Sequence, residues 1–199
     1  ADKAVNESIL NPLKYYNNNI GNLIKLLEVI NNFNLSSFIF SSSCTVYGEP
    51  SIVPVNENTP IQPAFSPYGY TKQVGEKMLT DFFTTKKKTS LTILRYFNPI
   101  GAHPSSLIGE LPLGVPSNLV PYITQTAIGK RKQLTIFGND YKTADGTCVR
   151  DYIHVVDLAR AHVLSLKNQN MTNNTYNVGV GKGHSVLEVV NSFEEINNL

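Results

Sequence analysis

The side chains best suited to proton chemistry in this chain are Tyr68, Lys72 and Ser43. Tyr68 and Lys72 are four residues apart, about one helical turn, so a helix would project both from the same face. The ammonium is expected to lower the pKa of the phenol from about 10 toward neutral pH. Such a phenol can exchange a proton with a carbinol while a nicotinamide exchanges the hydride, and this is the chemistry that the three residues predict.

Two elements must bring these side chains together. Residues 36–42 form a short apolar run typical of a buried strand, and Ser43 follows at its carboxyl end, where active sites of open α/β sheets gather. Ser66 is a natural N-cap and Pro67 a natural first helical residue, so a helix is predicted to begin there. A second strand is predicted over 91–97. Strand, helix and strand then make one right-handed crossover, which requires a parallel sheet.

The rest of the chain alternates helix and strand patterns with turn-rich loops. Helices are predicted over 6–33, 66–85 and 118–128, over a segment capped by Asp157 that ends near 166, and after the capping box of Ser185 and Glu188. Strands are predicted over 134–137, 149–155 and 175–178, and loops over 46–63 and 98–117. This order indicates an α/β fold: a Rossmann-like doubly wound parallel sheet, incomplete here, with a smaller mixed α/β substrate domain.

Composition narrows the class of protein. The 199 residues are 41% hydrophobic and 16% charged with a formal net charge of +2, which is typical of a globular chain. The basic clusters 86–88 and 130–132 are short and lack interleaved aromatic residues, so no nucleic acid partner is predicted. Two cysteines and no metal-ligand spacing predict neither a disulfide framework nor a metal site. Without a recognisable signal peptide or an apolar stretch of about 18 residues, a cytoplasmic protein with no membrane partner is predicted.

By itself, Tyr-x-x-x-Lys is a weak signal, because such pairs occur by chance on helix surfaces. Three features favour an active site over a chance pair on a helix surface: the helix start at Ser66, the preceding strand that ends in serines, and Ser43. The surrounding runs add a resemblance: they are residues 41–48 (SSSCTVYG), 66–69 (SPYG), 94–104 (LRYFNPIGAHP) and 150–159 (RDYIHVVDLA).

These runs resemble the extended short-chain dehydrogenase/reductase superfamily and, within it, the UDP-glucose 4-epimerase family, over nearly the whole chain. Residues 118–122 and 136–141 are typical of the epimerases rather than of the wider superfamily. The resemblance implies that 1–97 is the C-terminal part of an NAD-binding Rossmann domain. It implies that 98–199 is mainly a nucleotide-sugar domain, with about 149–170 packing back on the Rossmann sheet.

The resemblance gives the same three residues catalytic roles beside both sugar and cofactor. Tyr68 would be the general base for the sugar 4-hydroxyl, and Ser43 would share that hydrogen bond. Lys72 would lower the pKa of Tyr68 and bind the ribose hydroxyls of NAD, and the positive charge of the oxidised nicotinamide would lower that pKa further.

Three more positions match the dinucleotide site of the family: Lys3, Asn18 and Phe97. For Asn18 the competing interpretation is an ordinary amide on a helix surface. His103 and His154 are interpreted as structural, because the phenol and the lysine already supply the proton chemistry.

The positions that match the sugar-nucleotide site are Asn98, Asn118, Leu119, Thr135, Ile136, Phe137 and Arg150, together with Ser43 and Tyr68. Arginine suits a diphosphate because its planar donors bind phosphate bidentately; an ordinary ion pair to Asp151 or Asp157 is the competing interpretation for Arg150. A plain helix cap competes at Asn118. Residues 135–137 would lay backbone and a ring against the uracil, although Phe137 by itself is typical of a core residue.

The implied reaction is the interconversion of UDP-glucose and UDP-galactose by inversion at C4, through a transient 4-keto sugar and with bound NAD, in a homodimer. A nucleotide-sugar 4,6-dehydratase is an alternative, but it would need Asp-Glu where Cys44 and Thr45 stand. A UDP-uronic acid decarboxylase is another, and the epimerase-specific runs argue against it.

A hypothesis of a different class is an inactive piece of a longer enzyme. A dinucleotide site needs a glycine-rich turn after a first strand and an acidic residue about 20 residues on. No such turn precedes the first predicted helix, and the C-terminal end of the substrate domain is also expected to be missing. The glycines of 179–183 come too late and are interpreted as a loop against a helix start.

Overall fold

A computed structural model describes residues 1–86, 88–167 and 173–199. The chain forms two compact units: the first comprises 1–96 and 159–178, and the second 97–158 and 179–199. Lys87 of the first basic cluster, and 168–170 of the segment predicted to pack back on the sheet, lie outside the described residues. The cofactor and substrate roles assigned to the two parts of the chain stay a prediction.

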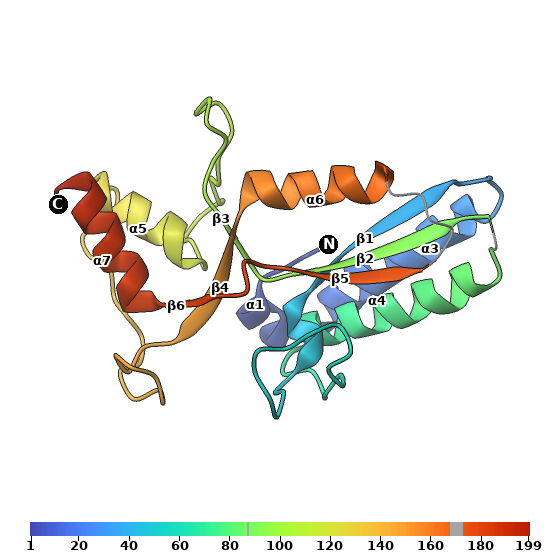
Figure 1. Cartoon of the computed structure of the whole chain (residues 1–199), viewed down its shortest axis with the longest axis horizontal. Coiled ribbons are helices and arrows are strands. Elements are labelled where there is room, and N and C mark those ends of the chain that lie inside the picture. The colour runs from blue at the N-terminus through green and yellow to red at the C-terminus, as the bar shows by residue number, and fades with distance from the viewer. Residues whose placement is uncertain (87, 168–172) are drawn as a thin grey trace. The chain divides into compact units, whose positions relative to one another are not determined.

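The first unit is built on a parallel sheet of three strands: β1 (Ser37–Ser43), β2 (Ser90–Tyr96) and β5 (Asn174–Val178). β2 lies between the other two (Figure 1). Ser43 is opposite Tyr96, and Tyr96 is opposite Val178, so the three strands end together. The parallel strands confirm the predicted α/β fold, and their common end is the edge where the candidate site lies.

The predicted helix over 6–33 is wrong as a single element. The structure divides it into α1 (Val5–Leu10), α2 (Pro12–Tyr15), the π-helix η1 (Tyr16–Gly21) and α3 (Asn22–Ile30). The break falls at Asn11, whose φ of −131° and ψ of 60° are not helical. Because Pro12 crowds the residue before it, Asn11 is disfavoured in the α conformation.

Helix α4 (Pro67–Thr84) carries two of the predicted catalytic residues, and it begins as predicted: the Ser66 hydroxyl accepts a hydrogen bond from Gly69 N at 3.1 Å. Between β1 and α4 the chain forms the short 3₁₀ helix η2 (Cys44–Tyr47) and a loop. The core of the unit lies between α3, α4 and the sheet; its buried members are Leu23, Leu27, Leu79, Phe83, Leu91 and Ile93.

Helices cover both faces of this sheet. Successive side chains of a strand point to opposite faces. Ser42 donates to Glu76 on α4, whereas Ser41 forms a hydrogen bond of 3.2 Å with His162 on α6 (Val155–Lys167). The part of α6 in the first unit, 159–167, therefore lies on the face opposite α4 (Figure 1).

The second unit contains β3 (Asn98–Ile100), β4 (Val149–His154) and β6 (Gly183–Ser185), with α5 (Leu119–Ala127) and α7 (Val186–Asn197). β3 is parallel and β6 antiparallel to β4. The capping box of α7 is confirmed: Ser185 Oγ accepts from Glu188 N at 3.0 Å, and Glu188 Oε2 accepts from Ser185 N at 2.8 Å.

Two predictions in this unit are wrong. Residues 134–137 form no strand, because no described strand pairs with them, and an unpaired extended segment has no ladder. Asp157 is not the cap of α6, which begins at Val155; instead His154 Nδ1 accepts from Val156 N at 3.2 Å.

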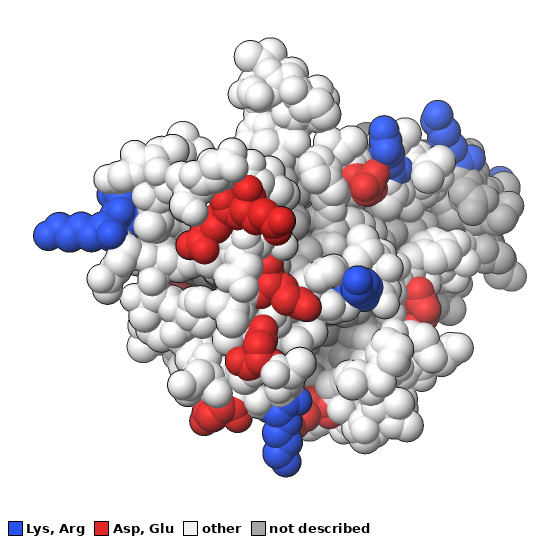
Figure 2. Space-filling model, turned by 60° about the vertical axis from the view of Figure 1, so that its left-hand side comes forward, with Lys and Arg blue, Asp and Glu red and all other residues white. Residues whose placement is uncertain are grey.

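None of the helices in the described ranges combines the length and apolar character that crossing a membrane requires. On the face drawn in Figure 2, the described Lys and Arg side chains stand apart from one another and form no continuous patch. In the same residues no three His, Cys, Asp or Glu side chains gather as metal ligands would.

Candidate active site

The structure brings Ser43, Tyr68 and Lys72 together at the end of β1. Ser43 is the last residue of that strand, Tyr68 lies in the first turn of α4, and Lys72 lies one turn further on. Ser43 lies close enough to the Tyr68 phenol for hydrogen bonding from its hydroxyl to lower the pKa of that phenol. Lys72 Nζ lies 5.8 Å from the centroid of the Tyr68 ring. The strand end and the helix start thus place a hydroxyl, a phenol and an ammonium as the sequence predicts.

The predicted direction of the Tyr68 pKa is wrong. Burial raises the pKa of the phenol above its usual value, the hydrogen bond from Ser43 lowers it, and Tyr96 and Cys44 raise it further. Withdrawing a phenolate from water costs more free energy than one hydrogen bond restores. Lys72 does not reverse this balance; its ammonium donates to the carbonyl oxygen of Ser41 at 2.8 Å.

Lys72 is itself perturbed by burial. The residue is 7% exposed, and burial lowers its pKa from 10.5 to about 8, while the negative charge of Glu76 raises that pKa. The ring of Phe40 lies below the ammonium at 5.1 Å. Besides the bond to Ser41, the structure gives this ammonium no hydrogen bond to a described residue. Because an ammonium has three N–H donors, two are available to a ligand.

Sequence reasoning missed the hydroxyl of Thr45. Its Oγ1 is buried and is the one buried side-chain polar atom of the described residues that has no hydrogen-bond partner. Buried hydroxyls nearly always have a hydrogen-bond partner. The Thr45 hydroxyl, two residues after Ser43, is therefore suited to a hydrogen bond with a ligand. Sequence reasoning uses Thr45 only as a position where a 4,6-dehydratase would have a carboxylate.

Of the other predicted cofactor residues, Lys3 is exposed and Asn18 lies in η1. Asn18 donates to Asn19 Oδ1 at 3.4 Å and accepts from Asn22 Nδ2 at 2.9 Å. Asn19, which the sequence did not single out, makes the longer connections: its side chain bonds both backbone groups of Asp2 and donates to Thr71 on α4. Asn19 thus ties the first residues of the chain to α4.

Apart from Ser43 and Tyr68, which lie in the first unit, the predicted sugar-nucleotide residues belong to the second unit, as does Phe97 of the cofactor set. Phe97 and Asn98 are half-buried around the start of β3. Asn118 is the N-cap residue of α5, directly before Leu119, but its side chain makes no cap bond; its amide donates to Glu110 Oε1 at 3.0 Å. The helix-cap interpretation of the Asn118 side chain is therefore wrong.

Residues 135–137 form an irregular segment in which Ile136 is half-buried and Thr135 is exposed. Phe137 is 84% exposed. The interpretation of Phe137 as a core residue is therefore wrong: without strand pairing, nothing packs this segment into the interior.

Arg150 forms no ion pair with a described carboxylate; its Nη1 donates to Val149 O at 2.8 Å, and the side chain is otherwise exposed. The carboxylate of Asp151 accepts instead from Val180 N and Gly181 N, both at 2.9 Å. These bonds hold the glycine loop after β5 against β4. The same bonds occupy two amides of that loop.

The segment after Phe137 is fastened to α7. Asp145 accepts hydrogen bonds from the backbone and hydroxyl of Thr147 at 2.8 Å and from the Ser185 hydroxyl. The pKa of Asp145 is lowered, first by the bond from Ser185 and then by those from Thr147. His103 bonds locally to Ser105 at 2.7 Å, and His154 covers Gly101, so both histidines have structural contacts.

Comparison with known proteins covers nearly the whole chain. Residues 1–179 match the NAD dependent epimerase/dehydratase family. The chain is 50% identical over 199 residues to UDP-glucose 4-epimerase of Haemophilus influenzae and 52% identical over 196 residues to that of Bacillus subtilis, with 99% and 98% of the chain covered. It spans 59% and 58% of the lengths of those relatives.

Solved structures agree. UDP-glucose 4-epimerase of Bifidobacterium longum, in complex with NAD⁺ and UDP, has a TM-score of 0.95 at 45% identity, covering 100% of this chain and 59% of that one. The Stenotrophomonas maltophila enzyme, with bound NAD and formylated UDP-arabinopyranose, has a TM-score of 0.94 at 48% identity, with 100% and 60% covered. The resemblance predicted from the motifs is confirmed, and the chain belongs to the NAD dependent epimerase/dehydratase family.

Proposed function

We propose that the natural protein containing this chain interconverts UDP-glucose and UDP-galactose by inversion at C4, with bound NAD. The relatives that are 50% and 52% identical to this chain are named UDP-glucose 4-epimerase, and the similar B. longum structure is a complex with NAD⁺ and UDP. The observation that carries the proposal is the group of Ser43, Tyr68 and Lys72. The hydroxyl of Ser43 is at the end of β1, and the phenol and the ammonium project from successive turns at the start of α4.

The residues of the first unit fit a dinucleotide and a sugar. Lys72 has two N–H donors beyond the one to Ser41, which suits neighbouring ribose hydroxyls, and the buried Thr45 hydroxyl has no protein partner. Bound NAD supplies the hydride acceptor and donor at sugar C4. Tyr68 would remove the O4 proton as the hydride leaves C4, and would return a proton to O4 when the hydride is delivered to the opposite face of C4 after the 4-keto sugar has turned over; Ser43 lowers the pKa of the phenol. Lys3, Asn18 and Phe97 are proposed to complete the dinucleotide site.

The second unit is proposed to hold the UDP group. Arg150 has no carboxylate partner among the described residues, so its guanidinium is available to the diphosphate. The exposed ring of Phe137, with Thr135 and Ile136, is available to the uracil. Asn98, Asn118 and Leu119 are proposed as further contacts.

The dehydratase alternative is not favoured. Expelling a 6-hydroxyl requires an extra acid–base pair, and η2 begins with Cys44 and Thr45, neither of which is a carboxylate. The homodimer and the cytoplasmic location that the family implies are also proposals, and sedimentation of the natural protein tests the first of them.

The test is a coupled assay of the intact natural protein with UDP-galactose, with dTDP-glucose and UDP-glucuronic acid run in parallel. We expect UDP-glucose from UDP-galactose, and a loss of about 10²- to 10⁴-fold in rate for Tyr68→Phe. Tyr70→Phe is the matched control, because this tyrosine lies on the same helix and is 50% exposed. Normal turnover by Tyr68→Phe, or dehydration of dTDP-glucose without epimerisation, contradicts the proposal.

A further inference from the structure

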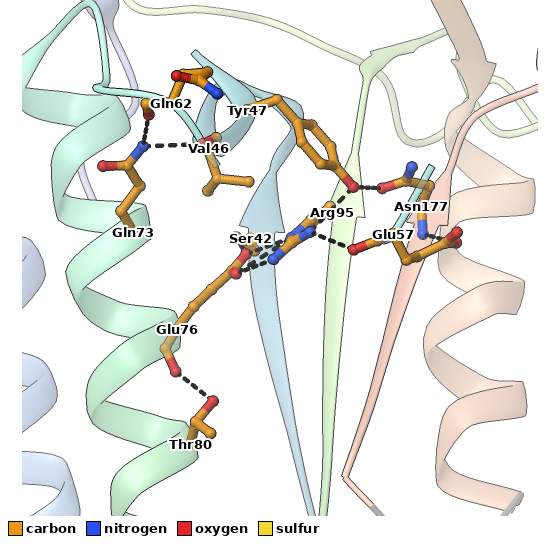
Figure 3. Close-up of polar contacts among 10 residues, drawn as sticks. All are labelled: Ser42, Val46, Tyr47, Glu57, Gln62, Gln73, Glu76, Thr80, Arg95 and Asn177. Atoms are coloured by element: carbon orange, nitrogen blue, oxygen red, sulfur yellow. Dashed lines mark hydrogen bonds and ion pairs between the residues drawn. The ribbon is translucent and has the colours of Figure 1, made fainter. Parts of the chain in front are cut away.

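One turn beyond Lys72 on α4, Glu76 forms a buried ion pair with Arg95 on β2 (Figure 3). Arg95 Nη2 donates to Glu76 Oε2 at 2.6 Å, and Nε donates to both carboxylate oxygens at 3.0 and 3.2 Å. The two side chains are only 8% and 7% exposed. Burial by itself lowers the pKa of Arg95, but the hydrogen bonds to Glu76 and Tyr47 outweigh it and raise that pKa, so the guanidinium stays charged.

The pair belongs to a hydrogen-bond network that joins several segments around the strand end. Ser42 Oγ donates to Glu76 Oε1 at 2.5 Å, and Arg95 Nη1 donates to Tyr47 Oη at 3.1 Å (Figure 3). Tyr47 in turn donates to Asn177 Oδ1 on β5 at 2.6 Å. Asn177 N donates to Glu57 in the loop before α4 at 2.7 Å, so one network joins β1, η2, that loop, α4, β2 and β5.

The network reaches the proposed catalytic residues through their neighbours. Lys72 and Glu76 are one turn apart on α4, and each binds the end of β1: Lys72 binds Ser41 O at 2.8 Å, and Glu76 binds Ser42 Oγ. Ser43 is the next residue of the strand. Two bonds on successive turns fix both the distance and the rotation of a helix against a strand.

We propose that Glu76 and Arg95 are positioning residues that hold α4 on the end of β1 and thereby place Lys72 and Ser43 for catalysis. A well-packed apolar pair is commonly as stable as a buried ion pair, so stability alone does not require these charges. Apolar contacts are not directional, whereas hydrogen bonds to a carboxylate are. The Glu76 carboxylate therefore selects one geometry for the Ser42 hydroxyl and for the Arg95 guanidinium. The kinetic part of the proposal rests on the proposed function.

The experiment compares Glu76→Gln with the double variant Glu76→Leu/Arg95→Met in the intact natural protein. The double variant removes both charges of the ion pair, so we expect it to keep its thermal midpoint even where the single variant is destabilised. In both variants we expect kcat for UDP-galactose to fall by roughly 10- to 100-fold, because misplaced catalytic groups lose their alignment. We expect KM to change by less than about twofold, because the residues proposed to bind the UDP group lie in the second unit.

Asp81→Asn is the matched control: it makes the same chemical change on the same helix, in the exposed pair of Lys77 and Asp81. It is expected to leave both kinetic constants unchanged. A folded double variant with the native kcat overturns the positioning role. The positioning role is also overturned if the loss of kcat in Glu76→Gln is no larger than its unfolded fraction explains and the double variant is fully active.

A crystal structure of the double variant gives a readout independent of turnover. We expect the bond from Lys72 Nζ to Ser41 O, 2.8 Å in the native chain, to be broken or lengthened beyond hydrogen-bond distance. An unchanged bond and an unchanged Ser43 rotamer count against positioning. If the native protein fails to epimerise UDP-galactose, the proposed function fails, and this structure still decides whether the ion pair positions Lys72.

Discussion

Lys72 Nζ donates a hydrogen bond of 2.8 Å to the carbonyl oxygen of Ser41, so the ammonium is fastened to the end of β1. The same ammonium lies 5.8 Å from the ring centroid of Tyr68, while the phenol lies within hydrogen-bonding reach of Ser43. Ser43 and Lys72 therefore have different roles beside Tyr68. Ser43 lowers the pKa of the phenol directly, and Lys72 offers its remaining donors to a ligand.

Replacing Ser43 tests this division. Ser43→Ala removes the bond that lowers the pKa of Tyr68, so that pKa, already raised by burial, is expected to rise further. At neutral pH less of the phenol is then available as a base. We expect kcat to fall by about 10- to 100-fold, and the acidic limb of its pH profile to move to higher pH.

The measurement is kcat for UDP-galactose across pH in the intact protein. Ser36→Ala is the control, because Ser36 is exposed and directly precedes the same strand. A uniform loss of rate with an unmoved pH profile would mean that Ser43 does not tune Tyr68.

Lys72 gives a prediction about stability. Burial lowers its folded-state pKa from 10.5 to about 8, so between these values the unfolded chain binds the proton and the folded chain does not. The free energy of unfolding therefore rises with pH in this window. Below about pH 8 the lysine is charged in both states, and the cost of burying the ammonium remains. Relative to Lys72→Met, native stability should rise by about 1 to 3 kcal/mol across the window.

Urea denaturation of both proteins without bound dinucleotide, at pH values from below 8 to above 10, measures this difference. Lys77→Met serves as the control, since Lys77 is exposed and its substitution should leave the pH dependence unchanged. A difference between native protein and Lys72→Met that is flat across pH contradicts the buried-ammonium interpretation.

Gly75 allows α4 to approach β1. A Cβ built there would lie 2.8 Å from Cζ of Phe40, the ring below the Lys72 ammonium. Gly75→Ala gains about 1 kcal/mol of helix propensity. Overpacking costs more, so the variant should be destabilised by about 1 to 2 kcal/mol net.

Combining Gly75→Ala with Phe40→Leu, which removes the clashing end of the ring, should recover part of this loss. Denaturant midpoints of the two single variants and the double variant measure the coupling. Strictly additive effects would show that Gly75 and Phe40 do not limit the approach of the helix.

Features that depend on neighbouring residues could be predicted from the sequence. The Ser66 cap, the capping box of Ser185 and Glu188, and the strands β1, β2 and β5 all form as predicted, because caps and apolar runs act over a few residues. The spacing of Tyr68 and Lys72 likewise placed both on one helix face. The strands β3 and β6 were missed, since each has three residues and exists only through its pairing with β4.

What the tertiary structure decided is the electrostatics of the site. From the sequence, Lys72 appeared as the group that lowers the pKa of Tyr68; in the folded chain, burial raises that pKa and the ammonium binds Ser41. Nothing in the sequence pairs Glu76 with Arg95, which are 19 residues apart on different elements. Residue types and spacing determined which groups are present, whereas their charge states depend on desolvation and on contacts between distant segments, which arise only when helix and sheet pack.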